Sequence, residues 1–299
     1  MKNIITSLVC LLFAISFSYA QDKDLKFNED QLLNHLKILS SDKFEGRRTG
    51  QKGNNLARAY IIEQFKSLNV RGYQGNYEHP FSFDTRIGAF NANNILVEIK
   101  GTEHPDKYIV ISAHHDHLGV SGDKIFNGAD DDASGISALF SFAEYLTKNP
   151  PKHSVILAAF DAEELGLRGA KHFLANFDTS KILINLNMDM ISRSAKNELY
   201  AVGARYNKAL KSIVDNFENS TTSKLLQGHD GTDGKQDWTM SSDHGPFHVA
   251  KIPFLYFGNE DHAAYHKETD VFEDITPEFY KNSVHMILSI FETIDTSGL

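Results

Sequence analysis

Hydrophobic residues recur with a helical period in several segments of the chain. From about Glu29 to Leu39, the leucines at positions 32, 33, 36 and 39 fall on one face, which predicts an amphipathic helix. The same period predicts helices over about 51–68, 134–148, 169–176 and 207–217, and a last helix that begins at Thr276–Pro277. Proline directly after the threonine is typical of a helix N-terminus.

Short apolar runs lie between these helices and predict strands. They span 94–99, 108–113, 155–160, 182–187, 199–202 and 252–257. The run Val155–Phe160 is apolar without interruption, as expected of a strand covered on both faces of a sheet. Alternation of helical and strand-like periods predicts an α/β fold.

Composition narrows the class of protein. The chain has 299 residues, 41% of them hydrophobic and 23% charged, which is ordinary for a globular domain and unlike disordered or fibrous chains. The formal charge of -9 argues against nucleic-acid binding, which requires a basic surface. No repeat, linker or low-complexity tract divides residues 21–299, so we expect one domain there.

The first twenty residues have the pattern of a signal peptide. Lys2 precedes an apolar run, and Ser18-Tyr19-Ala20 fits a signal-peptidase site. We therefore expect residues 1–20 to be removed and the product to be exported, to the periplasm or the medium, without stable membrane association; an uncleaved anchor is the alternative. Removal of Lys2 and Cys10 leaves 29 basic and 39 acidic residues, a net charge of -10, and no cysteine.

Polar clusters rich in histidine and carboxylates follow the predicted strands. The clusters are His114–His117, Asn127–Gly135, Asp161–Glu164, Asp189 and Asp261–His266. The carboxyl ends of strands form the ligand crevice of open α/β sheets, so these clusters can converge. Taken singly, Asp130–Asp132 could be a helix cap and Glu163–Glu164 an exposed first turn. Asp189 has no such local explanation, because burial of an isolated carboxylate within an apolar segment costs much free energy.

Together the clusters favour a cation site. Without cysteine, the ligands must be imidazole nitrogens and carboxylate oxygens, which suit catalytic zinc, with manganese or cobalt as possible substitutes. Two cations that share a carboxylate would lie roughly 3.5–4 Å apart, as in binuclear hydrolases.

Five motifs in order resemble the zinc aminopeptidases of peptidase family M28, of the leucine-aminopeptidase-like Streptomyces/Vibrio type. They are Ala113–Gly119, Gly128–Gly135, Glu163–Gly166, Asn187–Ile191 and Tyr265-His266, and the segments Phe44–Gly50 and Ser242–Phe247 also look familial. The resemblance covers nearly all of residues 21–299. It implies a single-domain, three-layer α/β/α fold with a mixed, mostly parallel central sheet.

The resemblance also implies a set of metal ligands. His114 and Asp189 would hold one Zn²⁺, Glu164 and His266 would hold a second, and Asp131 would bridge the two. Spacing alone leaves the choice among His114, His115 and His117 open. Asp116 would accept the second imidazole proton of His114, while Asp130 and Asp132 look like local helix-start residues.

Peptide hydrolysis follows from the same resemblance. A hydroxide that bridges the two cations would attack the peptide carbonyl, with Glu163 as general base and Tyr265 as a donor to the oxyanion. We expect a monomeric aminopeptidase that acts on peptides with a free N-terminus, because the carboxylates at the site attract the substrate amine. The alternatives are a glutaminyl-cyclase-like aminoacyl transferase with one zinc ion, and a non-catalytic peptide-binding relative. Ser242–Phe247 and the Gln227–Gln236 loop are the candidate walls of the specificity pocket.

Overall fold

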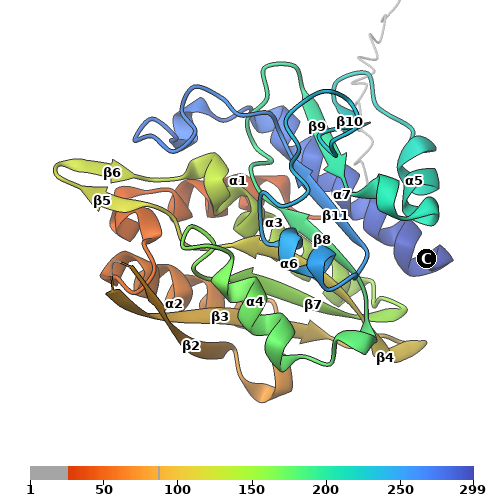
Figure 1. The fold of residues 1–299 in the computed structure, drawn as a ribbon, viewed down its shortest axis with the longest axis horizontal. Coiled ribbons are helices and arrows are strands. Elements are labelled where there is room, and N and C mark those ends of the chain that lie inside the picture. Colours follow the sequence, from red (N-terminus) through yellow and green to blue (C-terminus); the bar gives the residue numbers. More distant parts are fainter. Residues whose placement is uncertain (1–25, 87) are drawn as a thin grey trace, which may run out of the picture.

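A mixed β-sheet forms the centre of the molecule (Figure 1). The structure is a computed structural model that describes residues 26–86 and 88–299, so the predicted signal peptide lies outside the described residues. The main sheet has the order β1-β3-β7-β4-β8-β11-β9-β10, and β2 pairs with β3. Its strands are β1 (Arg71–Gly72), β2 (Glu78–Thr85), β3 (Gly88–Ile99), β4 (His104–His114), β7 (His153–Phe160), β8 (Ile182–Met188), β9 (Glu198–Val202), β10 (Lys224–Gln227) and β11 (Phe254–Gly258). The four central strands β7, β4, β8 and β11 run parallel to one another.

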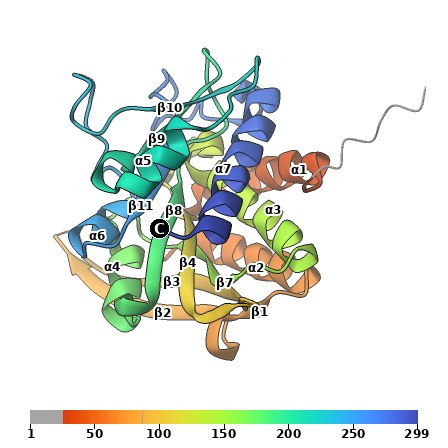
Figure 2. The same ribbon diagram turned by 90° about the vertical axis from the view of Figure 1, so that its right-hand side faces the viewer.

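Helices cover both faces of this sheet, which gives three layers (Figure 2). One face carries α1, α2, α3 and α7, and the other carries α4 and α6. The helices are α1 (Glu29–Leu39), α2 (Lys52–Ser67), α3 (Ser134–Lys148), α4 (Arg168–Asn176), α5 (Lys208–Asp215), α6 (His244–Val249) and α7 (Pro277–Ser297). The predicted α/β/α fold with a mixed sheet is confirmed.

Strand β4 shows why the sheet needs cover on both sides. Its side chains alternate between two hydrophobic cores, because successive residues of a strand point to opposite faces. Ile109 and Ile111 belong to the large core with α1, α2, α3 and α7, whereas Tyr108 and Val110 belong to the smaller core with α4 and α6. The almost unbroken apolar runs of the sequence have this origin.

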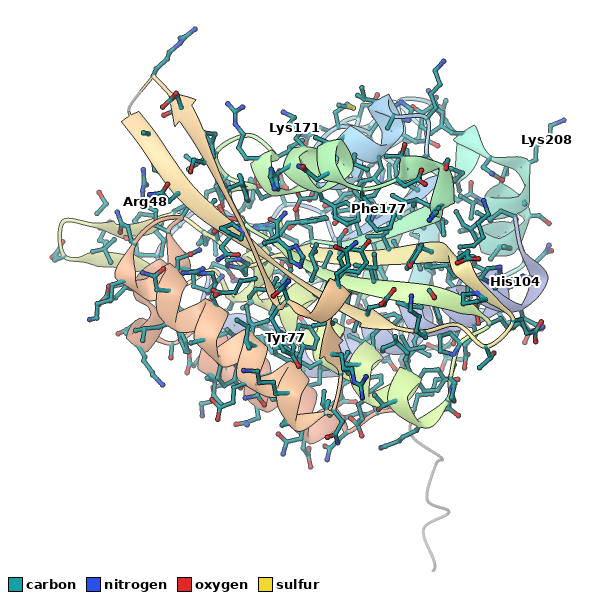
Figure 3. All side chains as sticks on the ribbon, turned by 90° about the horizontal axis from the view of Figure 1, so that it is seen from below. Arg48, Tyr77, His104, Lys171, Phe177 and Lys208 are labelled. Atoms are coloured by element: carbon teal, nitrogen blue, oxygen red, sulfur yellow. The ribbon has the colours of Figure 1, made fainter. Side chains whose placement is uncertain are left out.

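The predicted helices and strands are present, with ends displaced by a few residues. Most of the elements that the periodicity did not predict lie at the periphery: β2, the hairpin of β5 (Gly119–Ser121) and β6 (Lys124–Phe126), and β10. The helix α6 is largely buried, but it is too short to show a helical period. The strand β2 pairs only with β3, and no residue in it is fully buried, so it lacks the apolar run of a central strand. Figure 3 shows this edge, with α2 on one side of the sheet and α4, which carries Lys171, on the other.

Within residues 26–86 and 88–299, we find no helix that is both long and apolar enough to cross a membrane.

Candidate active site

The polar clusters converge where the parallel strands end. His114 is the last residue of β4, Glu163 and Glu164 follow β7, and Asp189 follows β8. His266 lies in the long connection after β11. Because these parallel strands end at one edge of the sheet, their following residues share one crevice. Asp131, in the π-helical turn Ala129–Ala133, completes the cluster.

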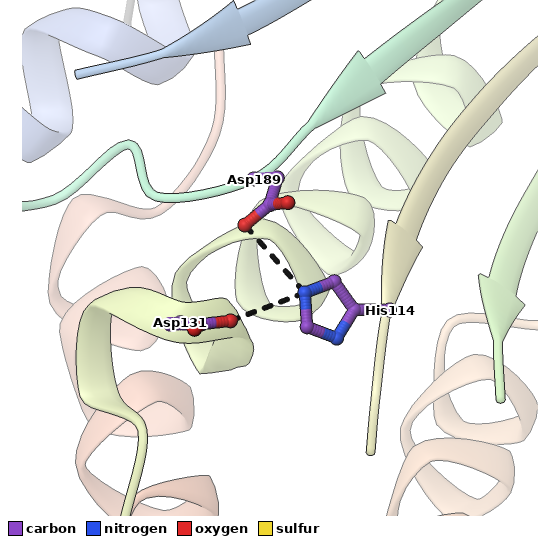
Figure 4. Close-up of side chains that lie close together, drawn as sticks. All are labelled: His114, Asp131 and Asp189. Atoms are coloured by element: carbon purple, nitrogen blue, oxygen red, sulfur yellow. Dashed lines mark ion pairs between the residues drawn. The ribbon is translucent and has the colours of Figure 1, made fainter. Parts of the chain in front are cut away.

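One group of potential metal ligands contains His114, Asp131 and Asp189 (Figure 4). His114 Nε2 lies 3.2 Å from Asp131 Oδ1 and 3.5 Å from Asp189 Oδ1. All three side chains come from residues that are nearly inaccessible to solvent. The structure therefore brings together the three residues predicted around the first cation.

A second group lies on the other side of Asp131. His266 Nε2 is 3.2 Å from Asp131 Oδ2 and 3.5 Å from Glu164 Oε2. His117, whose role the sequence left open, places Nδ1 2.8 Å from Glu164 Oε1. The two carboxylate oxygens of Asp131 therefore face different groups, as a bridging ligand requires.

The hydrogen bonding of this second group fits a cation. Three atoms of this group are buried and have no hydrogen-bond partner within the described residues: Nδ1 and Nε2 of His117, and Oε1 of Glu164. Buried polar atoms without partners are rare in folded proteins. Imidazole nitrogens and carboxylate oxygens without thiolate are also the donor set of catalytic zinc. The residues present thus fit a metal on both sides of Asp131.

Burial and charge act in opposite directions on these carboxylates. Burial would raise the pKa of Asp131, but the imidazoles of His117, His114 and His266 hold it well below its usual range. Burial raises the pKa of Asp189 and Glu163, and His114 only partly opposes the shift. Repulsion among the carboxylates adds to the shift at Glu163, so cations at this site would relieve an existing crowding of negative charge.

Asp116 lies beside His114, as expected, but contacts the ring through its backbone rather than its carboxylate. The contact of His114 Nδ1 is with the backbone carbonyl of Asp116, at 3.0 Å, while the nearer carboxylate oxygen is 3.8 Å away. The Asp116 carboxylate instead accepts the backbone N–H groups of Glu163, at 3.0 Å, and Glu164, at 3.4 Å. It also contacts the hydroxyl of Thr49. Asp116 thereby holds the turn that carries the two glutamates.

The acidic run Asp130–Asp132 divides into separate roles. Asp132 accepts the N–H of Gly135 at the start of α3, as a helix-start residue should, and also that of His114. Asp130 does not act locally. Its carboxylate accepts from Ser192 and contacts His262, so it ties the turn to distant loops.

Arg47 is a site residue that periodicity did not reveal. It ends the 3₁₀ helix Asp42–Arg47, and only 1% of it is exposed. Its guanidinium donates to the carbonyl oxygens of Leu39, His115, Asn127 and Gly128. The available signals were the polar, glycine-containing character of the segment Phe44–Gly50 and its family resemblance. Neither signal distinguishes a buried arginine side chain from an exposed one.

A cavity of about 330 Å³ opens onto both groups. Its lining includes Glu163, Tyr265, and the apolar side chains of Met190, Trp238 and Met240. The segment 236–241 forms part of the wall. Of the predicted Gln227–Gln236 loop, only the last residue, Gln236, contributes to the lining. The predicted wall Ser242–Phe247 is not part of the lining, because those residues are packed behind it.

Comparisons with known proteins identify the family and the fold of the chain. Aminopeptidase YwaD of Bacillus subtilis is 29% identical over 209 residues, which cover 65% of this chain and 43% of the relative. The chain thus spans less than half the length of that relative. Among solved structures, the zinc aminopeptidase BSAP of Bacillus subtilis aligns with a TM-score of 0.73 at 16% identity, over 93% of this chain and 98% of that one. A glutaminyl cyclase of Porphyromonas gingivalis aligns with a TM-score of 0.71 at 16% identity, over 89% of this chain and 98% of that one.

The two structural neighbours share the fold but differ in named activity, so fold likeness does not choose between those activities. The family model for "Peptidase family M28" matches residues 94–291, a segment that contains the ends of the central strands and both potential ligand groups. The chain therefore belongs to peptidase family M28.

Proposed function

We propose that this chain is an exported zinc aminopeptidase that binds two zinc ions. The observation that carries this proposal is the position of Asp131, whose Oδ1 faces His114 and whose Oδ2 faces His266. A carboxylate with each oxygen turned to a different imidazole is suited to bridge two cations. Export rests on the pattern of residues 1–20.

The ligands divide between the two ions. His114 and Asp189 would hold one ion, Glu164 and His266 would hold the other, and Asp131 would contact both. When bound, two zinc ions would lower the pKa of water between them and polarise the peptide carbonyl. The remaining chemistry belongs to side chains of this chain.

Glu163 is the proposed proton-transfer residue. It lines the cavity beside the ligands, and its backbone N–H is fixed by the Asp116 carboxylate. Glu163 would accept a proton from the attacking water and return it to the leaving amine. Tyr265, which stacks on His266 at a centroid distance of 3.9 Å, would donate its hydroxyl hydrogen to the carbonyl oxygen as negative charge develops.

The carboxylates of the cavity also favour substrates with a free N-terminus. Glu163, Glu164, Asp189 and Asp261 all contribute to the lining. A protonated amine is attracted to such a surface, whereas the carboxylate of a peptide C-terminus is repelled. Peptides with unblocked N-termini are therefore the proposed substrates.

Metal analysis together with a substrate panel tests this function. We expect two zinc ions per chain, hydrolysis of leucine p-nitroanilide and free peptides, and no cleavage of N-acetylated peptides. Equal cleavage of blocked peptides would contradict an aminopeptidase. One zinc ion together with cyclisation of N-terminal glutamine would instead support a glutaminyl cyclase, and peptide binding without turnover would support a non-catalytic relative.

The Glu163→Gln variant tests the proton-transfer role. Glutamine keeps the size of the side chain but cannot accept the proton, so we expect kcat to fall by about 10²–10⁴ while two zinc ions remain bound. Metal analysis and steady-state kinetics measure both effects. Glu63→Gln, an exposed change on α2, serves as control and should leave kcat unchanged. Undiminished turnover by Glu163→Gln would remove Glu163 from the mechanism.

A further inference from the structure

The imidazole ring of His117 is buried beside Glu164 and Asp131 and forms no hydrogen bond with the described residues. The residue is 1% exposed and lies three positions after His114, beyond the end of β4. Neither ring nitrogen has a hydrogen-bond partner among the described residues. A buried imidazole of this kind loses its hydration without compensation, unless another ligand takes the place of water.

The ring is aimed at two carboxylates of the second group. His117 Nδ1 lies 2.8 Å from Glu164 Oε1 and 3.7 Å from Asp131 Oδ2. Neither atom of the shorter contact has a hydrogen-bond partner, so this contact is not a hydrogen bond. It is an ion pair only when the ring is protonated. Atoms that surround one zinc ion at about 2.0–2.1 Å in a tetrahedral arrangement are roughly 3.3 Å apart. The distances from His117 and His266 to the carboxylate oxygens of Asp131 and Glu164 range from 2.8 to 3.7 Å, so they lie on both sides of this value.

The loop around His117 fixes the ring in this direction. The backbone N–H of His117 donates to the carbonyl oxygen of Arg47, at 3.4 Å. On the other side, Gly128 leaves space for the ring, since a Cβ at that position would lie 2.6 Å from His117 Cδ2. The neighbouring His115 points elsewhere, with Nε2 3.1 Å from the carbonyl oxygen of Asn93.

We propose that His117 Nδ1 is a further ligand of the cation held by Glu164, His266 and Asp131. This inference rests on the proposed function, because it assumes that the site binds zinc. The second ion would then have two imidazole ligands, whereas the first has one, His114. The two sites would differ in donor set and therefore in affinity for zinc.

Zinc binding by three variants tests the proposal without reference to activity. His117→Ala removes the ligand. His117→Asn keeps a nitrogen donor near the position of Nδ1, but an amide nitrogen does not bind zinc. At the free zinc concentration that just saturates the wild type, we expect both variants to hold one ion instead of two. The zinc dissociation constant of the second site should rise roughly 100-fold or more. Removal of a side chain that only hydrogen-bonds to a metal ligand already lowers metal affinity by about 10–100-fold.

The matched control is His115→Gln, which changes the adjacent buried histidine and should still hold two ions. A His117→Asn variant with wild-type affinity for both ions would show that His117 forms only an ion pair with Glu164, and would overturn the proposal. If the wild type itself binds fewer than two ions, the proposed function fails together with this inference.

X-ray absorption of the wild type gives a readout that depends on no variant. If His114, His117 and His266 all bind, the two zinc ions have a mean of about 1.5 imidazole ligands each. If only His114 and His266 bind, the mean is about 1.0. A mean of 1.0 with two bound ions would leave the binuclear site intact and refute the role of His117 alone.

Discussion

The guanidinium of Arg47 is buried among backbone carbonyl oxygens. It joins the end of α1, through Leu39, to the loop after β4 and to the turn before α3. The planar fork of arginine can reach several acceptors in fixed directions, which lysine cannot do. One side chain thus sets the relative positions of the segments that carry His114 and Asp131.

Loss of this side chain should destabilise the whole domain. For Arg47→Met, we expect the free energy of unfolding to fall by about 3–5 kcal/mol, since several buried carbonyl groups lose their partners. Urea unfolding measures the change. The neighbouring Arg48→Met is the matched control, because Arg48 is only half-buried and donates to one carbonyl oxygen, that of Leu118. Its cost should stay within about 1 kcal/mol, and an equal cost for both variants would refute the special role of Arg47.

The turn between β6 and α3 shows how an element places Asp131, a proposed metal ligand. Gly128 has φ 54° and ψ 61°, a left-handed conformation that favours glycine. A Cβ there would lie 2.0 Å from the carbonyl oxygen of Asp131. Asp270 accepts the N–H groups of Asp130 and Asp131 from the other side. The turn is therefore fixed by a close approach of backbone atoms and by a carboxylate distant in sequence.

Gly128→Ala should disturb this turn and the proposed metal site together. We expect a loss of about 2–4 kcal/mol in the free energy of unfolding from the clash and the unfavourable φ, together with weaker zinc binding. Gly122→Ala is the control for φ alone, since Gly122 has φ 65° and no atom within 4 Å of its added Cβ. Similar losses in the two variants would show that close packing at Gly128 does not matter.

At the scale of the molecule, burial of neutral histidines couples folding to pH. Burial lowers the pKa of His35 to about 4, although Glu144 acts in the opposite direction. An unfolded histidine titrates near 6.5, so the unfolded chain binds more protons below that pH. The stability that neutral His35 preserves above pH 6.5 is therefore lost progressively as the pH falls from about 6.5 toward 4.

Replacement of His35 by phenylalanine should flatten this part of the stability profile. Urea unfolding of His35→Phe and wild type, measured from pH 7 to pH 4, should show a smaller decline for the variant. Tyr60→Phe serves as control, because it removes the hydroxyl 2.7 Å from His35 Nδ1 but leaves the histidine half-buried. Its decline should resemble that of the wild type, and identical slopes for all three proteins would contradict the effect of His35.

The sequence by itself determined the layers of the fold and the location of the site along the chain. Buried strands such as β7 appear as unbroken apolar runs because both of their faces are covered, and amphipathic helices show their period directly. Short peripheral elements such as β2 and β10 lack that signal, because few of their side chains are buried. The polar residues after the central strands marked the crevice, since parallel strands end at one edge.

Only the tertiary structure decided which side chains face one another. Spacing could not separate His114, His115 and His117. The His117 ring lies against Gly128 and the His115 ring contacts the carbonyl oxygen of Asn93, and neither contact can be read from the spacing of the histidines. The same reason explains Asp130, which resembled a helix cap but reaches Ser192 and His262. Periodicity reports burial along one element, whereas the partners of a buried polar atom are set by packing between elements.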